Sequence, residues 1–199
     1  MQNVSSKTKQ LTGTAVLIAI IILLQTMLGS IQIGPFTITL TLVPIIIGAV
    51  LYGPLTGAFL GLVFGVIVSI QVVTGAAGAG STMMLEMNPV ATITVCIVKG
   101  LAAGLVAGLA AAAAGKKNMW LGILLAAILA PIVNTGIFTV ALVTIFGPLA
   151  KQWAEAAGSA SMASYILAGI IGVNFVVELA ADVILAPIIM RIVCAIREN

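Results

Sequence analysis

The stretch PLTGAFLGLVFGVIVSIQVV, residues 54–73, contains no charged residue. A helix of this length rises about 30 Å, which matches the hydrocarbon core of a bilayer. Four other stretches are also apolar and almost uncharged, at residues 11–28, 90–114, 120–146 and 166–189. Over the chain, 62% of residues are hydrophobic and 7% are charged, against about 25% charged in soluble domains. The sequence therefore predicts a polytopic helical membrane protein.

The predicted fold is all-α, a six-transmembrane-helix bundle in one integral membrane domain over residues 1–199. Hydrophobic runs and Gly/Pro breaks place its helices at about 11–29, 42–52, 55–74, 87–114, 119–147 and 162–196. The second helix is short, and residues 30–41 form an extended first outer loop, because polar and apolar residues alternate there after Gly34-Pro35. We expect a flexible loop at 75–81 and a polar connection at 148–161.

The charges predict the orientation of the bundle. If all six helices cross the membrane, six basic residues fall on one side: Lys7, Lys9, Lys116, Lys117, Arg191 and Arg197. The opposite side then holds Glu86, Lys151 and Glu155. Basic residues accumulate in cytoplasmic loops, so both termini are predicted to be cytoplasmic.

The sequence argues against an enzyme. Histidine is absent, which removes the usual general base and the commonest metal ligand. A nucleophile motif and a phosphate-binding loop are also missing, so energy for concentrating a solute would have to come from a partner or an ion gradient. We expect no catalytic residue, no metal site and no cofactor.

Ionisable and amide side chains inside the apolar runs are the candidate binding groups, because charges at membrane depth usually face a partner or a wet cavity. From the helical rise, Lys99, Asn134 and Asn174 lie at similar depth on three helices, about 18–20 Å from one side. Lys99 either binds a ligand carboxylate or pairs with Glu178. Asn134 either contacts ligand or satisfies carbonyls freed by Pro131. Asn174 and Glu178 share a helix face, whereas Asp182 is expected to be structural or to face a partner.

Small residues recur at helix-packing spacing. Gly57, Gly61 and Gly65 form one double GxxxG pattern, and Gly100, Gly104 and Gly108 form another. Such patterns let membrane helices approach closely, so we interpret both as packing surfaces.

Together these features resemble the substrate-binding membrane subunits (S components) of energy-coupling-factor vitamin transporters. The resemblance covers nearly the whole chain and includes three runs: ITLTLVPIIIGAVLYGPLTGAFLGLVFG at 38–65, APIVNTGIF at 130–138 and NFVVELAADVILAPI at 174–188. The pair Ala15 and Ala19 matches the small-residue motif by which such subunits dock a membrane coupling protein.

The resemblance implies an ATP-driven importer in a bacterial cell membrane, whose partners are a transmembrane coupling protein and two ATPase subunits. It implies that a vitamin binds in an outward-facing pocket through Gln32, Thr37, Thr39, Asn88, Lys99, Asn134, Asn174 and Glu178. The chain looks most like pantothenate-type members, followed by riboflavin, biotin, lipoate and folate binders. It lacks the tryptophan cluster that thiamine binders use.

Two other functions compete with this one. The first is an ion-coupled secondary carrier that uses Glu178 and Asp182 as a proton relay. The second is a purely structural membrane subunit packed through its glycine faces, with Lys99 and Glu178 forming an internal ion pair.

Overall fold

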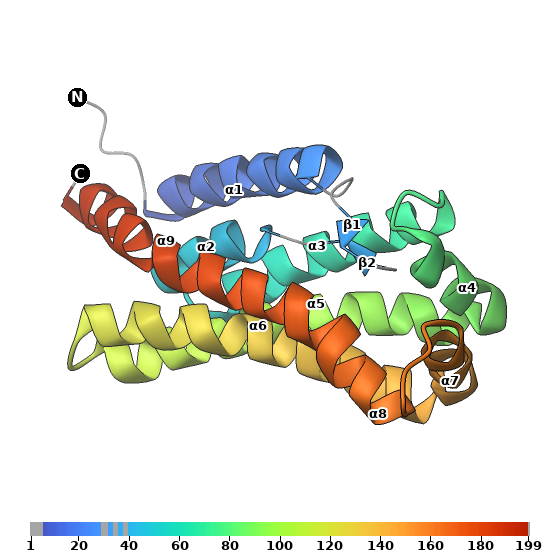
Figure 1. Cartoon of the computed structure of the whole chain (residues 1–199). Helices are drawn as coiled ribbons and strands as arrows, with labels where there is room; N and C mark the ends of the chain where they lie inside the picture. Colours follow the sequence, from blue (N-terminus) through green and yellow to red (C-terminus); the bar gives the residue numbers. More distant parts are fainter. Residues whose placement is uncertain (1–5, 29–31, 34–35, 38–39, 199) are drawn as a thin grey trace.

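The computed structural model describes residues 6–28, 32–33, 36–37 and 40–198. Long helices run side by side along one axis (Figure 1). They are α1 (Ser6–Leu28), α3 (Pro54–Val73), α5 (Pro89–Gly115), α6 (Met119–Thr144) and α9 (Val173–Glu198), with the shorter α2 (Leu42–Tyr52) between them. Within the described residues, five helices are long and apolar enough to cross a membrane, and α2 is a shorter apolar helix. The all-helical membrane fold is confirmed, while the count of six crossings stays a prediction.

The two ends of the bundle differ in chemistry. One end gathers the start of α1, the turn at Gly53, the α5–α6 loop and the end of α9 (Figure 1). We call it the basic end, because it carries Lys7, Lys9, Lys116 and Lys117. The hairpin end holds β1 (Gln32–Ile33), β2 (Phe36–Thr37), α4 (Ala79–Met87), α7 (Gly147–Ala156) and α8 (Met162–Tyr165).

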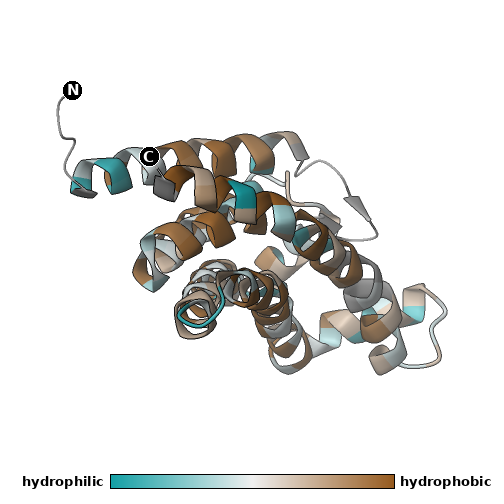
Figure 2. Cartoon of the chain, turned by 90° about the vertical axis from the view of Figure 1, so that its left-hand side faces the viewer, coloured by the Kyte–Doolittle hydropathy of each residue, from teal (hydrophilic) through white to brown (hydrophobic). Residues whose placement is uncertain are grey.

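Hydrophobic residues also cover much of the outside of the bundle. In Figure 2, which looks onto the basic end, hydrophobic colour covers most of the length of the helices, and hydrophilic colour is prominent at the start of α1. Only 17% of the apolar window of α1 is buried inside the protein. Such an exposed apolar surface fits contact with lipid or with another membrane subunit.

The two glycine patterns, predicted as packing surfaces, face each other across α3 and α5. A Cβ on Gly61 would collide with the carbonyl oxygen of Gly100, and a Cβ on Gly57 would collide with that of Gly104. A Cβ on Gly65 would lie 2.7 Å from the carbonyl oxygen of Cys96. The two backbones therefore touch along antiparallel helices, and van der Waals contact replaces the hydrophobic drive that lipid does not supply.

Two predicted connections contain short helices. Residues 79–81, expected in a flexible loop, begin α4, which follows Gly78 at a φ of 91°. The expected polar connection at 148–161 contains α7, whose Pro148 suits the first helical turn. Both helices are short, and each buries an apolar side chain against its neighbours, Met84 in α4 and Trp153 in α7.

Other boundaries shift for local reasons. Helix α1 begins at Ser6 rather than near 11, since its lysines and glutamine are good helix formers. The predicted helix at 87–114 divides at Asn88, which caps α5 just before Pro89. The last predicted helix, 162–196, contains a π-helical stretch, η1 (Ile166–Gly172). The extended first loop is a short hairpin where it is described, but Thr41 already has helical φ and ψ at the start of α2.

Candidate functional site

Lys99 places a positive charge inside the bundle. Its Nζ lies 5.7 Å from the ring centroid of Phe64 on α3 and 5.7 Å from that of Phe138 on α6. Both distances are within the range of a cation–π interaction. Side chains tilt towards the N-terminus of their helix, so Lys99 reaches from α5 towards the hairpin end.

The pairing of Lys99 with Glu178 is not formed. Among the residues that the structure describes, the ion pair joins Lys151 and Glu155 at 4.0 Å on exposed side chains, and Lys99 has no carboxylate oxygen at that distance. Two ring faces stabilise an ammonium group by about 0.5–2 kcal/mol each, but they do not neutralise it. The ammonium group of Lys99 is therefore available to form an ion pair with an anion.

Asn134 lies at a depth similar to that of Lys99. Lys99 is ten residues from the hairpin end of α5, and Asn134 is ten residues from the hairpin end of α6. In both helices this distance is about 15 Å along the axis. Asn134 is 4% exposed, and its Oδ1 has no hydrogen-bond partner among the described residues. A buried acceptor without a partner is uncommon and requires an explanation, such as a donor supplied by a ligand or water.

The acidic residues of α9 face the protein interior. Glu178 is 6% exposed and Asp182 is 2% exposed, on the same face as the buried Ala186 and Ile189. Among described residues, the Oδ2 of Asp182 has no hydrogen-bond partner. Asn174 belongs to the first turn of α9, one turn before Glu178. Its backbone position places it on the same face of α9 as Glu178, as predicted.

Three of the remaining predicted ligand contacts, Gln32, Thr37 and Asn88, lie at the hairpin end. Gln32 pairs with Thr37 across the β1–β2 hairpin, so two of these residues are neighbours in space. Thr39 lies outside the described residues. Asn88 caps α5 through a 3.1 Å hydrogen bond from the backbone N–H of Ala91 to its Oδ1. That bond gives Asn88 a structural role beside its predicted one.

A buried polar cluster near the same end was not predicted from the sequence. Thr41 donates a 2.8 Å hydrogen bond to Oε1 of Gln25, and Nε2 of Gln25 donates one of 2.8 Å to Oε1 of Gln71. Nε2 of Gln71 donates back to the carbonyl oxygen of Gln25 at 2.9 Å. Gln25 is 1% exposed. The cluster ties the end of α1 and the start of α2 to α3, so it anchors both ends of the first loop.

Ala15 and Ala19 lie on the exposed side of α1. On the opposite side, Leu17, Ile21 and Gln25 are buried against the bundle. The small-residue pair is therefore accessible to another membrane helix.

Comparison with known protein families gives a match. The model of the family "ECF transporter, substrate-specific component" matches residues 9–190 of this chain. This chain belongs to that family. Such S components are transport-binding subunits and not enzymes, and they pair with a membrane coupling protein and ATPases. Neither a curated protein nor a solved structure gives a significant match.

Family membership agrees with the arrangement of this S component. A small-molecule binding subunit needs polar groups inside an apolar bundle, and Lys99 and Asn134 are polar residues on two neighbouring helices. In this family, ATPases among the partner subunits supply the energy for transport.

Proposed function

We propose that this S component binds a small water-soluble vitamin in the hairpin-end half of the bundle, with pantothenate as the first candidate. The observation that carries the proposal is the ammonium group of Lys99, held over two aromatic rings without a carboxylate partner among the described residues. A carboxylate from the ligand would form an ion pair with this ammonium group in a region of low dielectric, where an ion pair is strong.

The order of candidates follows from this chemistry. Pantothenate is a small anion with hydroxyl and amide groups that can donate to the Oδ1 of Asn134. Riboflavin comes second, because asparagines on two helices can bind its ring, although it does not use the charge of Lys99. Biotin, lipoate and folate carry carboxylates and follow. Aromatic residues make up 5% of the chain, which offers little stacking surface for a large flat ring.

In the proposed binding mode, Lys99 holds the carboxylate and Asn134, Asn174 and Glu178 contact the polar body of the vitamin. Gln32, Thr37 and Thr39 belong to the first loop, which would cover the ligand. Asn88 lies at the hairpin end of α5, near the entrance. The exposed pair Ala15 and Ala19 would dock the coupling protein, and the basic end would face the cytoplasm of a bacterial cell.

The test is a thermal-shift screen of the purified protein against these five vitamins without nucleotide. A ligand at one hundred times its Kd stabilises the folded state by about 2.7 kcal/mol, or about 5–10 °C in Tm for a protein of this size. We expect one vitamin to give such a shift in the wild type and a much smaller one in Lys99→Met. If none of the five raises the Tm, vitamin binding is refuted.

An ion-coupled carrier is the second candidate, and it is favoured by the buried Oδ2 of Asp182 that lacks a hydrogen-bond partner in the described part of the chain. A carrier would move its solute in proteoliposomes that contain this chain alone, driven by a pH gradient and abolished by Asp182→Asn. An S component would show uptake only after the coupling protein, the ATPases and ATP are added.

A further inference from the structure

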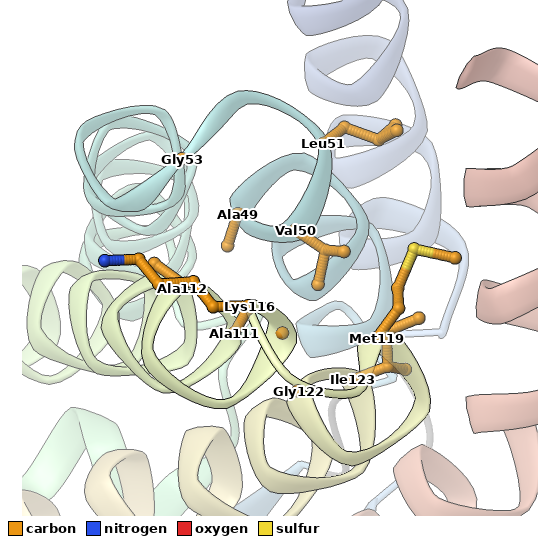
Figure 3. Close-up of a pocket in the computed structure, with 11 residues that line it drawn as sticks. Ala49, Val50, Leu51, Gly53, Ala111, Ala112, Lys116, Met119, Gly122 and Ile123 are labelled. Carbon is orange, nitrogen blue, oxygen red and sulfur yellow. The ribbon is translucent and has the colours of Figure 1, made fainter.

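The basic end contains a pocket that the vitamin site does not use. It has a volume of about 350 Å³ and lies between the end of α2 and the α5–α6 loop. Ala49 and Ile123 are buried at its base, whereas Ala112 and Lys116 are exposed at its mouth. Figure 3 shows aliphatic side chains and Met119 around this space, with the Lys116 side chain extending from the loop. The lining combines an apolar interior with one cation.

Neighbouring aromatic residues place this pocket at the membrane surface. Trp120 follows Met119 and is 39% exposed, and Tyr52 lies between two lining residues, Leu51 and Gly53. Tryptophan and tyrosine concentrate where the hydrocarbon layer meets the headgroups. Lysine at this level extends its charged tip towards the headgroups while its methylene stem stays in apolar surroundings. The pocket therefore opens where phospholipid phosphates lie.

The surrounding charge favours an anion. Lys117 is exposed beside Lys116, and Lys7 and Lys9 are exposed at the start of α1. A 3.1 Å hydrogen bond from Gln10 to Thr56 holds that start against the first turn of α3. Among acidic residues with described side chains, Glu86 and Glu155 lie at the hairpin end, and Glu178 and Asp182 are buried in α9.

We propose that this pocket binds one anionic phospholipid from the leaflet at the basic end. Lys116 contacts the phosphate, and the first part of an acyl chain packs against Leu51, Met119 and Ile123. The volume is at the lower end of the range for ligand pockets, about 300–1,000 Å³, so it holds part of a lipid and not the whole molecule. Basic pockets between membrane helices are suited to anionic headgroups.

The test is native mass spectrometry of the delipidated full chain, titrated with phosphatidylglycerol or with phosphatidylcholine of the same acyl chains. One lysine near an anionic surface is worth about a five-fold change in affinity. We expect the first phosphatidylglycerol to bind about five-fold more tightly than phosphatidylcholine. Lys116→Ala should remove this preference, and the matched control Lys117→Ala should keep most of it.

Two further arms separate the lipid from other occupants. Ala112→Phe narrows the mouth and should weaken the first binding event for both lipids, whereas glycerol phosphate should not compete. An equal loss in Lys116→Ala and Lys117→Ala would show diffuse surface attraction and overturn the proposal. So would displacement by glycerol phosphate, or an Ala112→Phe variant that binds lipid normally but loses assembly with the coupling protein. If Ala112→Phe does not fold, the comparison of the two lysine variants still decides.

Discussion

The cluster of Gln25, Thr41 and Gln71 gives the sharpest test of how the bundle is held together. Gln25→Leu keeps the size of the side chain and removes its amide. The substitution breaks the two 2.8 Å side-chain bonds, one from Thr41 and one to Gln71. The bond from Gln71 to the backbone carbonyl of residue 25 at 2.9 Å can persist. The substitution therefore removes two hydrogen bonds and leaves the hydroxyl of Thr41 without its acceptor. Thr41 is 1% exposed.

The expected destabilisation follows from these contacts. Hydrogen bonds between membrane helices average about 0.6 kcal/mol, with a maximum of about 1.7 kcal/mol. A buried hydroxyl left without its partner costs about 1–3 kcal/mol more. The total is about 2–4 kcal/mol, which corresponds to a decrease in Tm of about 5–12 °C for a protein of this size.

Thermal unfolding in detergent measures this effect, with Gln10→Leu as the matched control, because Gln10 is exposed and bonds to a different helix turn. Thr41→Val completes a double-mutant cycle with Gln25→Leu, and we expect a coupling energy of about 0.5–3 kcal/mol. The reasoning is refuted if the Tm of Gln25→Leu falls no further than that of Gln10→Leu, or if the two substitutions are additive.

Three other predictions test the packing, the docking surface and the charge site. Gly61→Leu should separate α3 from α5 and lower the free energy of unfolding by more than about 3 kcal/mol. The control Gly115→Leu, which has open space around its Cβ position, should lower it by less than about 1 kcal/mol. Similar losses for the two variants in thermal unfolding would contradict direct backbone contact. Ala15→Trp or Ala19→Trp should leave vitamin affinity unchanged but stop uptake in the reconstituted complex, and normal uptake would exclude docking through this face. Phe138→Leu should weaken vitamin binding about two- to five-fold by calorimetry, since it removes one of the two rings beside Lys99; unchanged affinity would contradict a ligand close to that ring.

The sequence predicts the long helices well because each is marked by uninterrupted hydrophobicity. The bounds of α2 follow from residues 42–52. The two glycine patterns predict close helix packing, but the structure is needed to show that α3 and α5 are the partners. The sequence does not predict α4 and α7 because glycines 78 and 80 and the pair Gly147-Pro148, at or near their starts, are typical of loops. Each is held by a buried side chain, Met84 or Trp153, whose partners lie elsewhere in the chain.

The candidate site is predicted in part. The depth of Lys99 and Asn134 can be counted from helix ends, but the rings of Phe64 and Phe138 beside the ammonium depend on how the helices rotate about their axes. The glutamine cluster does have a signal in the sequence: Gln25 and Gln71 are amides in apolar helices, both near the hairpin end. Amides at membrane depth seek partners, and two at one level are natural ones.

Isothermal titration calorimetry of wild type, Lys99→Met and Lys99→Arg with the vitamin found by screening tests the central claim most directly. If Lys99 binds the carboxylate, Lys99→Met should lose about 30-fold or more in affinity, as expected when a buried ion pair loses one partner, and Lys99→Arg should recover part of it. Replacing the carboxylate of the vitamin by a neutral amide should weaken binding to the wild type and change little in Lys99→Met. Equal affinities for the wild type and Lys99→Met, with both proteins folded, would contradict the account.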